Sequence, residues 1–149
     1  MLNLRVTEDA RGVLDVCLAR PDVRNAFNSA VIADLERVFT KDVLRPSVRV
    51  VVLRGEGAAF CAGGDLQWLR QAVELPYAKN LAETRRLSKL FDSMNQCPKP
   101  VIGAVHGFAI AGGVGLVSVC DHVVATRETQ FSLSEVRLGI VPACIGPFV

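Results

Sequence analysis

The order of apolar and polar residues along the chain predicts two strands first, and then helices that alternate with further strands. Leu2, Leu4 and Val6 alternate with polar residues, which is typical of a half-buried strand. Gly12 follows as a turn residue, and Val13–Leu18 is a second segment rich in strand-forming side chains. We therefore expect a β-hairpin at the start of the chain.

Apolar residues with helical spacing begin after this hairpin. The first helix is capped by Asn28 or Ser29, and its apolar face is formed by Val31, Leu35, Val38 and Phe39. A short helix is expected at 66–69, directly after Gly63-Gly64-Asp65. A longer helix follows Pro76, and its apolar stripe is formed by Leu87, Leu90, Phe91 and Met94.

Four further segments predict strands. Residues 48–53 and 101–105 are nearly continuous apolar runs, the pattern of strands that are buried on both faces. Residues 122–125 and 130–133 are shorter segments of the same kind. Because strands and helices alternate, the sequence predicts an α/β fold. The 149 residues have the length of one domain, which we place at 1–149.

The composition limits which partners, cellular compartment and metal sites are expected for this domain. Half of the residues are hydrophobic and 21% are charged, as in a globular protein with a large core. The net charge of +2 is too small to indicate nucleic acid or an anionic membrane as a partner. The five cysteines are scattered and odd in number, which favours reduced thiols in a cytoplasmic protein. With two histidines in the sequence, a histidine-rich metal centre is not expected.

The C-terminal segment 140–149 is mostly apolar and ends without a polar tail. Domains usually finish at a surface with soluble residues. We therefore expect that the chain is truncated, and that the whole protein contains a further part that completes the core.

The clearest chemical feature is a pair of glycine turns, each of which follows an apolar strand and precedes a helix. One contains Gly63 and Gly64, and the other is Ala111-Gly112-Gly113. Glycine lets backbone N–H groups approach a ligand closely, and N–H groups at a helix start have no intrahelical partner. If the turns lie together, they can aim two N–H donors at one oxygen, as an oxyanion hole does. The alternative is that these glycines only allow tight packing of helix on sheet.

Two phosphate-binding motifs fit the sequence less well. Gly113-Val114-Gly115 begins a G-x-G pattern, but Ser118 occupies the place of the third glycine in a dinucleotide-binding motif. The Gly-Lys-Ser/Thr sequence of a P-loop does not occur in the chain. The glycine turns are therefore better interpreted as a site for a single negatively charged oxygen.

One acidic residue, Glu135, lies downstream of the second turn, between a predicted strand and an apolar run. It is interpreted either as a partly desolvated general acid or base, or as a surface glutamate that starts a helix. Arg24 flanks a turn, where it is either solvated or in contact with an anion. His106 is expected to be a structural residue with its hydrogen bonds satisfied, and Trp68 to line the core or a pocket.

From about Leu4 to its end, the chain resembles the enoyl-CoA hydratase/isomerase superfamily, also called the crotonase superfamily. The segments that carry the resemblance are Arg20-Pro-Asp-Val-Arg-Asn-Ala-Phe-Asn28, Phe60-Cys-Ala-Gly-Gly-Asp-Leu66, Pro98-Lys-Pro-Val-Ile-Gly-Ala-Val-His-Gly107, Ala111-Gly-Gly-Val-Gly-Leu-Val-Ser-Val-Cys-Asp121 and Phe131-Ser-Leu-Ser-Glu-Val-Arg-Leu-Gly-Ile-Val-Pro142. The resemblance implies a crotonase-like spiral of ββα units, truncated before a C-terminal helical region that trimerises. The whole protein would then be a homotrimer or hexamer.

The resemblance also assigns roles to residues. In such proteins the carbonyl of an acyl-CoA thioester lies between two backbone N–H groups, which match Gly64 and Gly112, and the acid–base group matches Glu135. The positions that contact the CoA moiety match Arg24, Ala26, Ala62, Gly63, Asp65 and Leu66. No metal or redox cofactor is implied, because coenzyme A enters as part of the substrate.

One position departs from the hydratase pattern. Hydratases of the superfamily usually have a second glutamate, and the matching position here is Gly115, whereas members that only move a double bond keep one glutamate. The sequence as a whole is most similar to hydratases of the methylglutaconyl-CoA type. We therefore expect hydration of a 2-enoyl-CoA to a 3-hydroxyacyl-CoA. The alternatives are Δ3,Δ2-enoyl-CoA isomerisation by Glu135 alone, and a non-catalytic acyl-CoA binder or inactive fragment.

Overall fold

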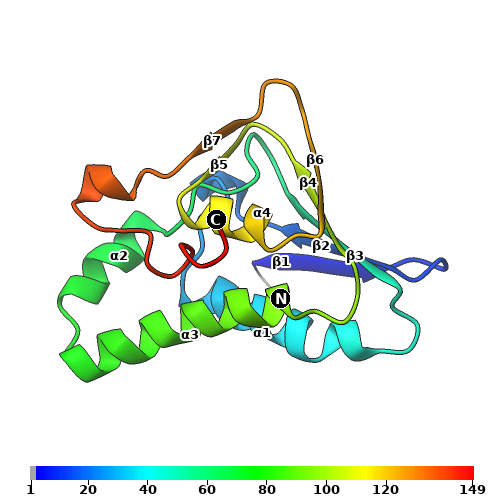
Figure 1. Ribbon diagram of the computed structural model, residues 1–149, viewed down its shortest axis with the longest axis horizontal. Helices are drawn as coiled ribbons and strands as arrows, with labels where there is room; N and C mark the ends of the chain where they lie inside the picture. Colours follow the sequence, from blue (N-terminus) through cyan, green and yellow to red (C-terminus); the bar gives the residue numbers. More distant parts are fainter. Residues whose placement is uncertain (1–2) are drawn as a thin grey trace.

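The structure is a computed structural model that describes residues 3–149 (Figure 1). It begins with β1 (Leu4–Glu8) and β2 (Val13–Leu18), which pair antiparallel as the expected hairpin. Leu2, which was assigned to the first strand, lies outside the described residues. Parallel strands continue the sheet in the order β1-β2-β3-β4-β6, and these strands are β3 (Val50–Gly55), β4 (Val101–Val105) and β6 (His122–Ala125).

A second, smaller sheet runs beside the first. β4 is followed by β5 (Phe108–Ile110), β6 is followed by β7 (Gln130–Ser132), and β5 pairs with β7 in parallel. Single parallel bridges, Cys61 to Ala109 and Phe27 to Gly64, extend this pairing toward the start of the chain. Each turn of the chain therefore gives one strand to the large sheet and one short segment to the small sheet, which is the expected ββα spiral.

Helices complete the turns of the spiral. They are α1 (Ser29–Thr40), α2 (Leu66–Val73), α3 (Tyr77–Asn95) and α4 (Gly112–Ser118), with short 3-10 helices η1 (Pro21–Val23), η2 (Asp42–Leu44) and η3 (Glu135–Leu138). Asn28 rather than Ser29 caps α1, because its Oδ1 accepts hydrogen bonds from the N–H groups of Ala30 and Val31, both at 3.1 Å. α1 and α3 lie side by side along one edge of the molecule in Figure 1.

The hydrophobic core lies between the large sheet and the helices. It includes Leu14, Val16 and Leu53 from the strands and Leu35, Leu90, Phe91 and Leu116 from the helices. The expectation that β3 and β4 are buried on both faces was wrong, because alternate residues of both strands are only half-buried. One face of the sheet packs into the core, and the other face is covered in part.

The five cysteines of the described chain are free thiols, and Cys17 and Cys61 are fully buried. Burial raises the pKa of the Cys61 thiol to about 12, so this thiol stays protonated and packs as an apolar group. Among the helices of residues 3–149, the structure shows none that is both long enough and apolar enough to span a membrane.

Candidate active site

The fold brings the two glycine turns together. The N–H of Ile110 donates to the carbonyl oxygen of Cys61 at 2.9 Å, which joins the segments that lead into the two turns. A Cβ placed on Gly63 would lie 2.7 Å from the carbonyl oxygen of Ile110 and 3.3 Å from the backbone nitrogen of Gly112. Gly63 also has a φ of +85°, which strongly favours glycine. A larger residue at position 63 would therefore push the turns apart.

Each turn presents an unpaired N–H group. The carbonyl of Gly63 and the N–H of Asp65 both pair with Phe27, at 2.9 and 3.0 Å, so the N–H of Gly64 points away from Phe27. Gly112 is the first residue of α4, where the N–H has no intrahelical partner. Within residues 3–149, neither the Gly64 N–H nor the Gly112 N–H donates a hydrogen bond. Both donors are therefore free to bind an oxygen atom.

The turn before Gly112 is held in an unusual conformation. Ala111 has a φ of +51° and a ψ of −118°, and its N–H donates to the carbonyl oxygen of Ser132 in β7 at 2.8 Å. Non-glycine residues in this region of backbone space cost roughly 1–3 kcal/mol and occur where the surroundings fix them. Gly112 itself packs against the Phe27 ring, since a Cβ there would come within 2.2 Å of Cζ. The position of the second donor is thus fixed by packing.

Glu135 is the first residue of η3, and two residues separate it from the end of β7. It therefore does start a helical turn, but it is only 8% exposed, so the interpretation as a surface glutamate was wrong. Its Oε2 atom is buried and has no hydrogen-bond partner among the described residues. A buried polar atom without a partner is costly, and such atoms are retained where a ligand or water completes their hydrogen bonds.

A cavity of about 320 Å³ connects these groups. Gly64, Gly112 and Glu135 all line it, together with Ala62 and Leu66 from the predicted CoA-contacting positions. Apolar side chains make up most of the remaining wall, including Phe27, Trp68, Leu69, Leu87 and Ile145. Two glycines with free N–H groups and a glutamate with a buried, unpaired carboxylate oxygen therefore line one largely apolar cavity.

The other predicted contact positions lie outside this cavity. Arg24 is exposed, with a φ of +53°, while Ala26 and Gly63 are buried in the backbone framework of the turns. The Asp65 carboxylate accepts hydrogen bonds from the Arg20 guanidinium at 3.1 Å and from the N–H of Gln67 at 3.0 Å. Asp65 therefore caps α2 and anchors the first glycine turn, and the Arg20 guanidinium binds Asp65 within the protein.

We expect the hydrogen bonds of the Asp65 carboxylate to contribute to the free energy of unfolding. Burial opposes ionisation of Asp65, but the hydrogen bonds from Arg20 and the α2 N–H groups outweigh it and lower the pKa below its ordinary value of 3.8. The stabilisation is complete above that value and is lost as the pH falls through the lowered pKa. Asp65→Ala should lower the free energy of unfolding at neutral pH by about 1 kcal/mol, because it removes both cap and ion pair.

The matched variant is Asp65→Asn, which keeps a capping side chain and removes the charge. Urea unfolding should place it between the original protein and Asp65→Ala at neutral pH. Below the folded pKa of Asp65, the difference between the original protein and Asp65→Asn should disappear. A difference that stays constant over the whole acidic range would contradict the anchoring role.

The position expected to hold a second glutamate is closed. Gly115 is buried inside α4, and a Cβ there would lie 2.3 Å from Ile145 Cγ2 and 3.0 Å from Phe91 Cε1. Figure 1 shows the C-terminal segment that contains Ile145 beside α4, and the Phe148 ring in the same segment packs against the Phe91 ring with centroids 6.2 Å apart and planes tilted by 40°. The space that a second acid would need is therefore occupied by apolar side chains.

Sequence reasoning did not single out Glu83, which also lines the cavity, from α3. The helical spacing could have indicated that Glu83 lies on the cavity side of α3. Four residues spaced for one helix face all line the cavity, namely Asn80, Glu83, Thr84 and Leu87. His106, by contrast, fits the structural role expected of it, since its Nε2 bonds with the carbonyl oxygen of Gly57 at 2.8 Å.

A parallel-strand spiral with two free glycine N–H groups beside a buried carboxylate defines a crotonase-type fold and site. The model of the enoyl-CoA hydratase/isomerase family matches residues 8–149, and the chain belongs to this family. The sequence is 38% identical over 138 residues to the enoyl-CoA hydratase ACTT6 of Alternaria alternata, covering 93% of this chain and 44% of that protein.

The chain is also similar to proteins that are named for a second activity, the isomerisation of dienoyl-CoA. The chain is 36% identical over 146 residues to the mitochondrial Δ(3,5)-Δ(2,4)-dienoyl-CoA isomerase of Rattus norvegicus, covering 93% of this chain and 45% of that protein. The crystal structure of an enoyl-CoA hydratase from Shewanella pealeana superposes with a TM-score of 0.94 at 34% identity, covering 99% of this chain and 55% of that one. The chain thus spans about half the length of the relatives it matches.

Proposed function

We propose that the protein hydrates a 2-enoyl-CoA to a 3-hydroxyacyl-CoA. The observation that carries this proposal is that Glu135, whose buried Oε2 has no partner, lines the same cavity as Gly64 and Gly112, whose N–H groups donate no hydrogen bond within residues 3–149. Relatives named enoyl-CoA hydratase support the substrate class. A protein that only bound acyl-CoA would gain nothing from an unpaired carboxylate buried beside the two donors, because such a group lowers stability.

The proposed chemistry needs one carboxylate. The thioester carbonyl oxygen accepts hydrogen bonds from the Gly64 and Gly112 N–H groups, which polarises the conjugated double bond. Glu135 takes a proton from water as the water oxygen bonds to C3, and the electrons of the double bond move onto the carbonyl oxygen as an enolate. Protonated Glu135 then gives the proton to C2, which regenerates the carbonyl. Both new bonds form on the face of the substrate that Glu135 occupies.

Isomerisation is the second candidate, because the packing at Gly115 leaves no room for the second glutamate that hydratases of the superfamily usually have. Two glutamates are not needed to move a double bond: Glu135 would take a proton from C2 of a 3-enoyl-CoA and return it to C4. The same enolate would form between the same two donors. The closure of position 115 by Ile145 and Phe91 is compatible with this single-carboxylate route.

The two reactions are separated by their products. We expect the full chain to convert a 2-enoyl-CoA to the 3-hydroxyacyl-CoA, and to do so faster than it converts a 3-enoyl-CoA to the 2-enoyl isomer. Loss of the absorbance of the conjugated thioester reports the first reaction, and chromatography of the CoA products reports the second. Double-bond migration without hydration would replace the first candidate by the second.

Three finer statements belong to this proposal. We propose, from the runs 112–117 and 134–143, that the chain belongs to the methylglutaconyl-CoA-hydratase-like branch; the acyl group of that branch is not carried over. Arg24, Ala26 and Asp65 are proposed to support CoA binding from outside the cavity, and no metal or redox cofactor takes part. The whole protein is proposed to be a homotrimer or hexamer. It is also proposed to be cytoplasmic, which is consistent with the free thiols of the described chain.

A further inference from the structure

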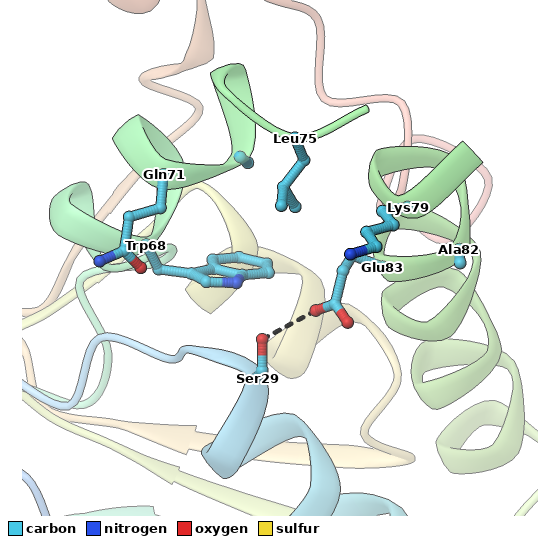
Figure 2. Close-up of a pocket in the computed structure, with 8 residues that line it drawn as sticks. Ser29, Trp68, Gln71, Leu75, Lys79, Ala82 and Glu83 are labelled. Atoms are coloured by element: carbon cyan, nitrogen blue, oxygen red, sulfur yellow. Dashed lines mark hydrogen bonds between the residues drawn. The ribbon is translucent and has the colours of Figure 1, made fainter. Parts of the chain in front are cut away.

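A second cavity, of about 370 Å³, adjoins the candidate active site (Figure 2). Trp68, Ala72 and Glu83 line both cavities, so the two meet at these residues. Ser29, Gln71 and Lys79 make the second cavity more polar than the first. An acyl chain that extends past the first cavity would therefore meet polar groups at the junction.

The junction holds an unused acceptor. Ser29 Oγ donates to Glu83 Oε2 at 2.7 Å, which fixes the carboxylate, while Glu83 Oε1 accepts no hydrogen bond from the described residues. Lys79 lies on the same helix, yet it makes no ion pair within residues 3–149. The carboxylate is thus oriented by one partner and keeps one oxygen for a ligand.

The junction also holds an unused donor. Figure 2 shows the Trp68 indole of α2 and the Glu83 side chain of α3 in the same cavity, with the Glu83 carboxylate directed toward Ser29. In the described part of the chain, the Trp68 Nε1–H has no hydrogen-bond acceptor, although Trp68 is half-buried. A free donor and a free acceptor that face one cavity match a group that both donates and accepts.

We propose that this junction is a subsite for a hydroxyl group on the acyl chain of the substrate. The hydroxyl would donate to Glu83 Oε1 and accept from Trp68 Nε1–H, so that Glu83 and Trp68 determine specificity. This inference rests on the proposed function only in taking an enoyl-CoA as the substrate class. A chain that ends in a carboxylate would face the Glu83 carboxylate, and the like charges would oppose its binding.

The test compares trans-2-hexenoyl-, trans-2-octenoyl- and trans-2-decenoyl-CoA with their ω-hydroxy and ω-carboxy analogues. The original protein should prefer the hydroxy form of at least one chain length by at least about tenfold in kcat/KM. Glu83→Leu should remove that preference, measured as the ratio of kcat/KM for the hydroxy chain to kcat/KM for the unsubstituted chain of the same length. Glu83→Gln, which keeps an acceptor and loses the charge, should keep part of the hydroxyl preference and admit the carboxy form.

A matched control is available on the same pair of helices. Glu36 of α1 accepts hydrogen bonds from Arg86 of α3 at 2.7 and 2.9 Å, and neither residue lines either cavity. Glu36→Gln should therefore leave the hydroxyl preference unchanged. A preference that survives Glu83→Leu, or an original protein that favours the carboxy or unsubstituted chains at every length, would overturn the subsite.

A binding experiment separates this inference from the proposed reaction. Isothermal titration with the saturated acyl-CoA and its ω-hydroxy analogue needs no turnover. If no enoyl-CoA is converted, the proposed function fails, and the subsite is still supported by tighter binding of the hydroxy analogue that Glu83→Leu abolishes. Equal binding of the two saturated ligands would overturn the subsite, whatever the reaction.

Discussion

Glu135→Gln is expected to lower kcat by at least about 10²-fold, because glutamine has the size of glutamate but cannot transfer a proton. The variant keeps a polar side chain where Oε2 lacks a partner, so it should fold normally and bind acyl-CoA about as well as the original protein. The measurement is steady-state turnover of a 2-enoyl-CoA, combined with circular dichroism to confirm the fold. The loss should fall on kcat and leave KM nearly unchanged.

Glu128→Gln is the matched control for this prediction. Glu128 is an exposed glutamate in the loop between β6 and β7, outside the cavity. The same chemical change there should leave kcat unaltered. If Glu135→Gln retained the turnover of Glu128→Gln, Glu135 would have no part in proton transfer, and the chemistry proposed for the cavity would fail with it.

Gly115→Glu is expected to destabilise the fold, and not to supply the second acid of a two-glutamate hydratase. The new Cβ would overlap Ile145 Cγ2 at 2.3 Å, and the carboxylate would be buried among apolar side chains. Overpacking together with an uncompensated buried charge should lower the free energy of unfolding by about 3 kcal/mol or more. Urea unfolding at neutral pH measures this loss.

A double-mutant cycle identifies the cause. Gly115→Ala should destabilise the protein through its contact with Ile145, and Ile145→Ala should destabilise it by leaving a cavity. In the double variant the new methyl group enters the space that Ile145 leaves, so the total loss should be smaller than the sum of the single losses. Strict additivity of the two losses would show that Ile145 does not close position 115.

Local patterns in the sequence predicted the long elements well. The strand over Val13–Leu18 is β2, and the helix start at Asn28 depends on a hydrogen-bonding side chain and nearby apolar spacing. β5 was not predicted, because its three residues lie inside the glycine-rich segment and are ordered by pairing with β7 and Cys61. Short strands of this kind depend on partners that are distant in the sequence, so local pattern does not reveal them.

The candidate site was predictable in part for the same reason. Glycine turns are visible in the sequence, and both turns do lie together beside Glu135. The apolar neighbours of Glu135 allowed a buried or a surface position for it, and the sequence did not decide between the two because helices α2 and α3 and the C-terminal segment enclose the cavity from far away in the chain. The bond between the Asp65 carboxylate and Arg20 was not predictable either, because the two residues are 45 positions apart in the sequence.

The most direct test of the central claim follows the proton that reaches C2. When a 2-enoyl-CoA is hydrated in D2O, NMR of the 3-hydroxyacyl-CoA product should show one deuterium at C2, on the same face as the new hydroxyl. In Glu135→Gln, the rate of this incorporation should fall by at least about 10²-fold. Incorporation at an unchanged rate in the variant, or on the opposite face in the original protein, would contradict a site in which Glu135 alone moves the proton.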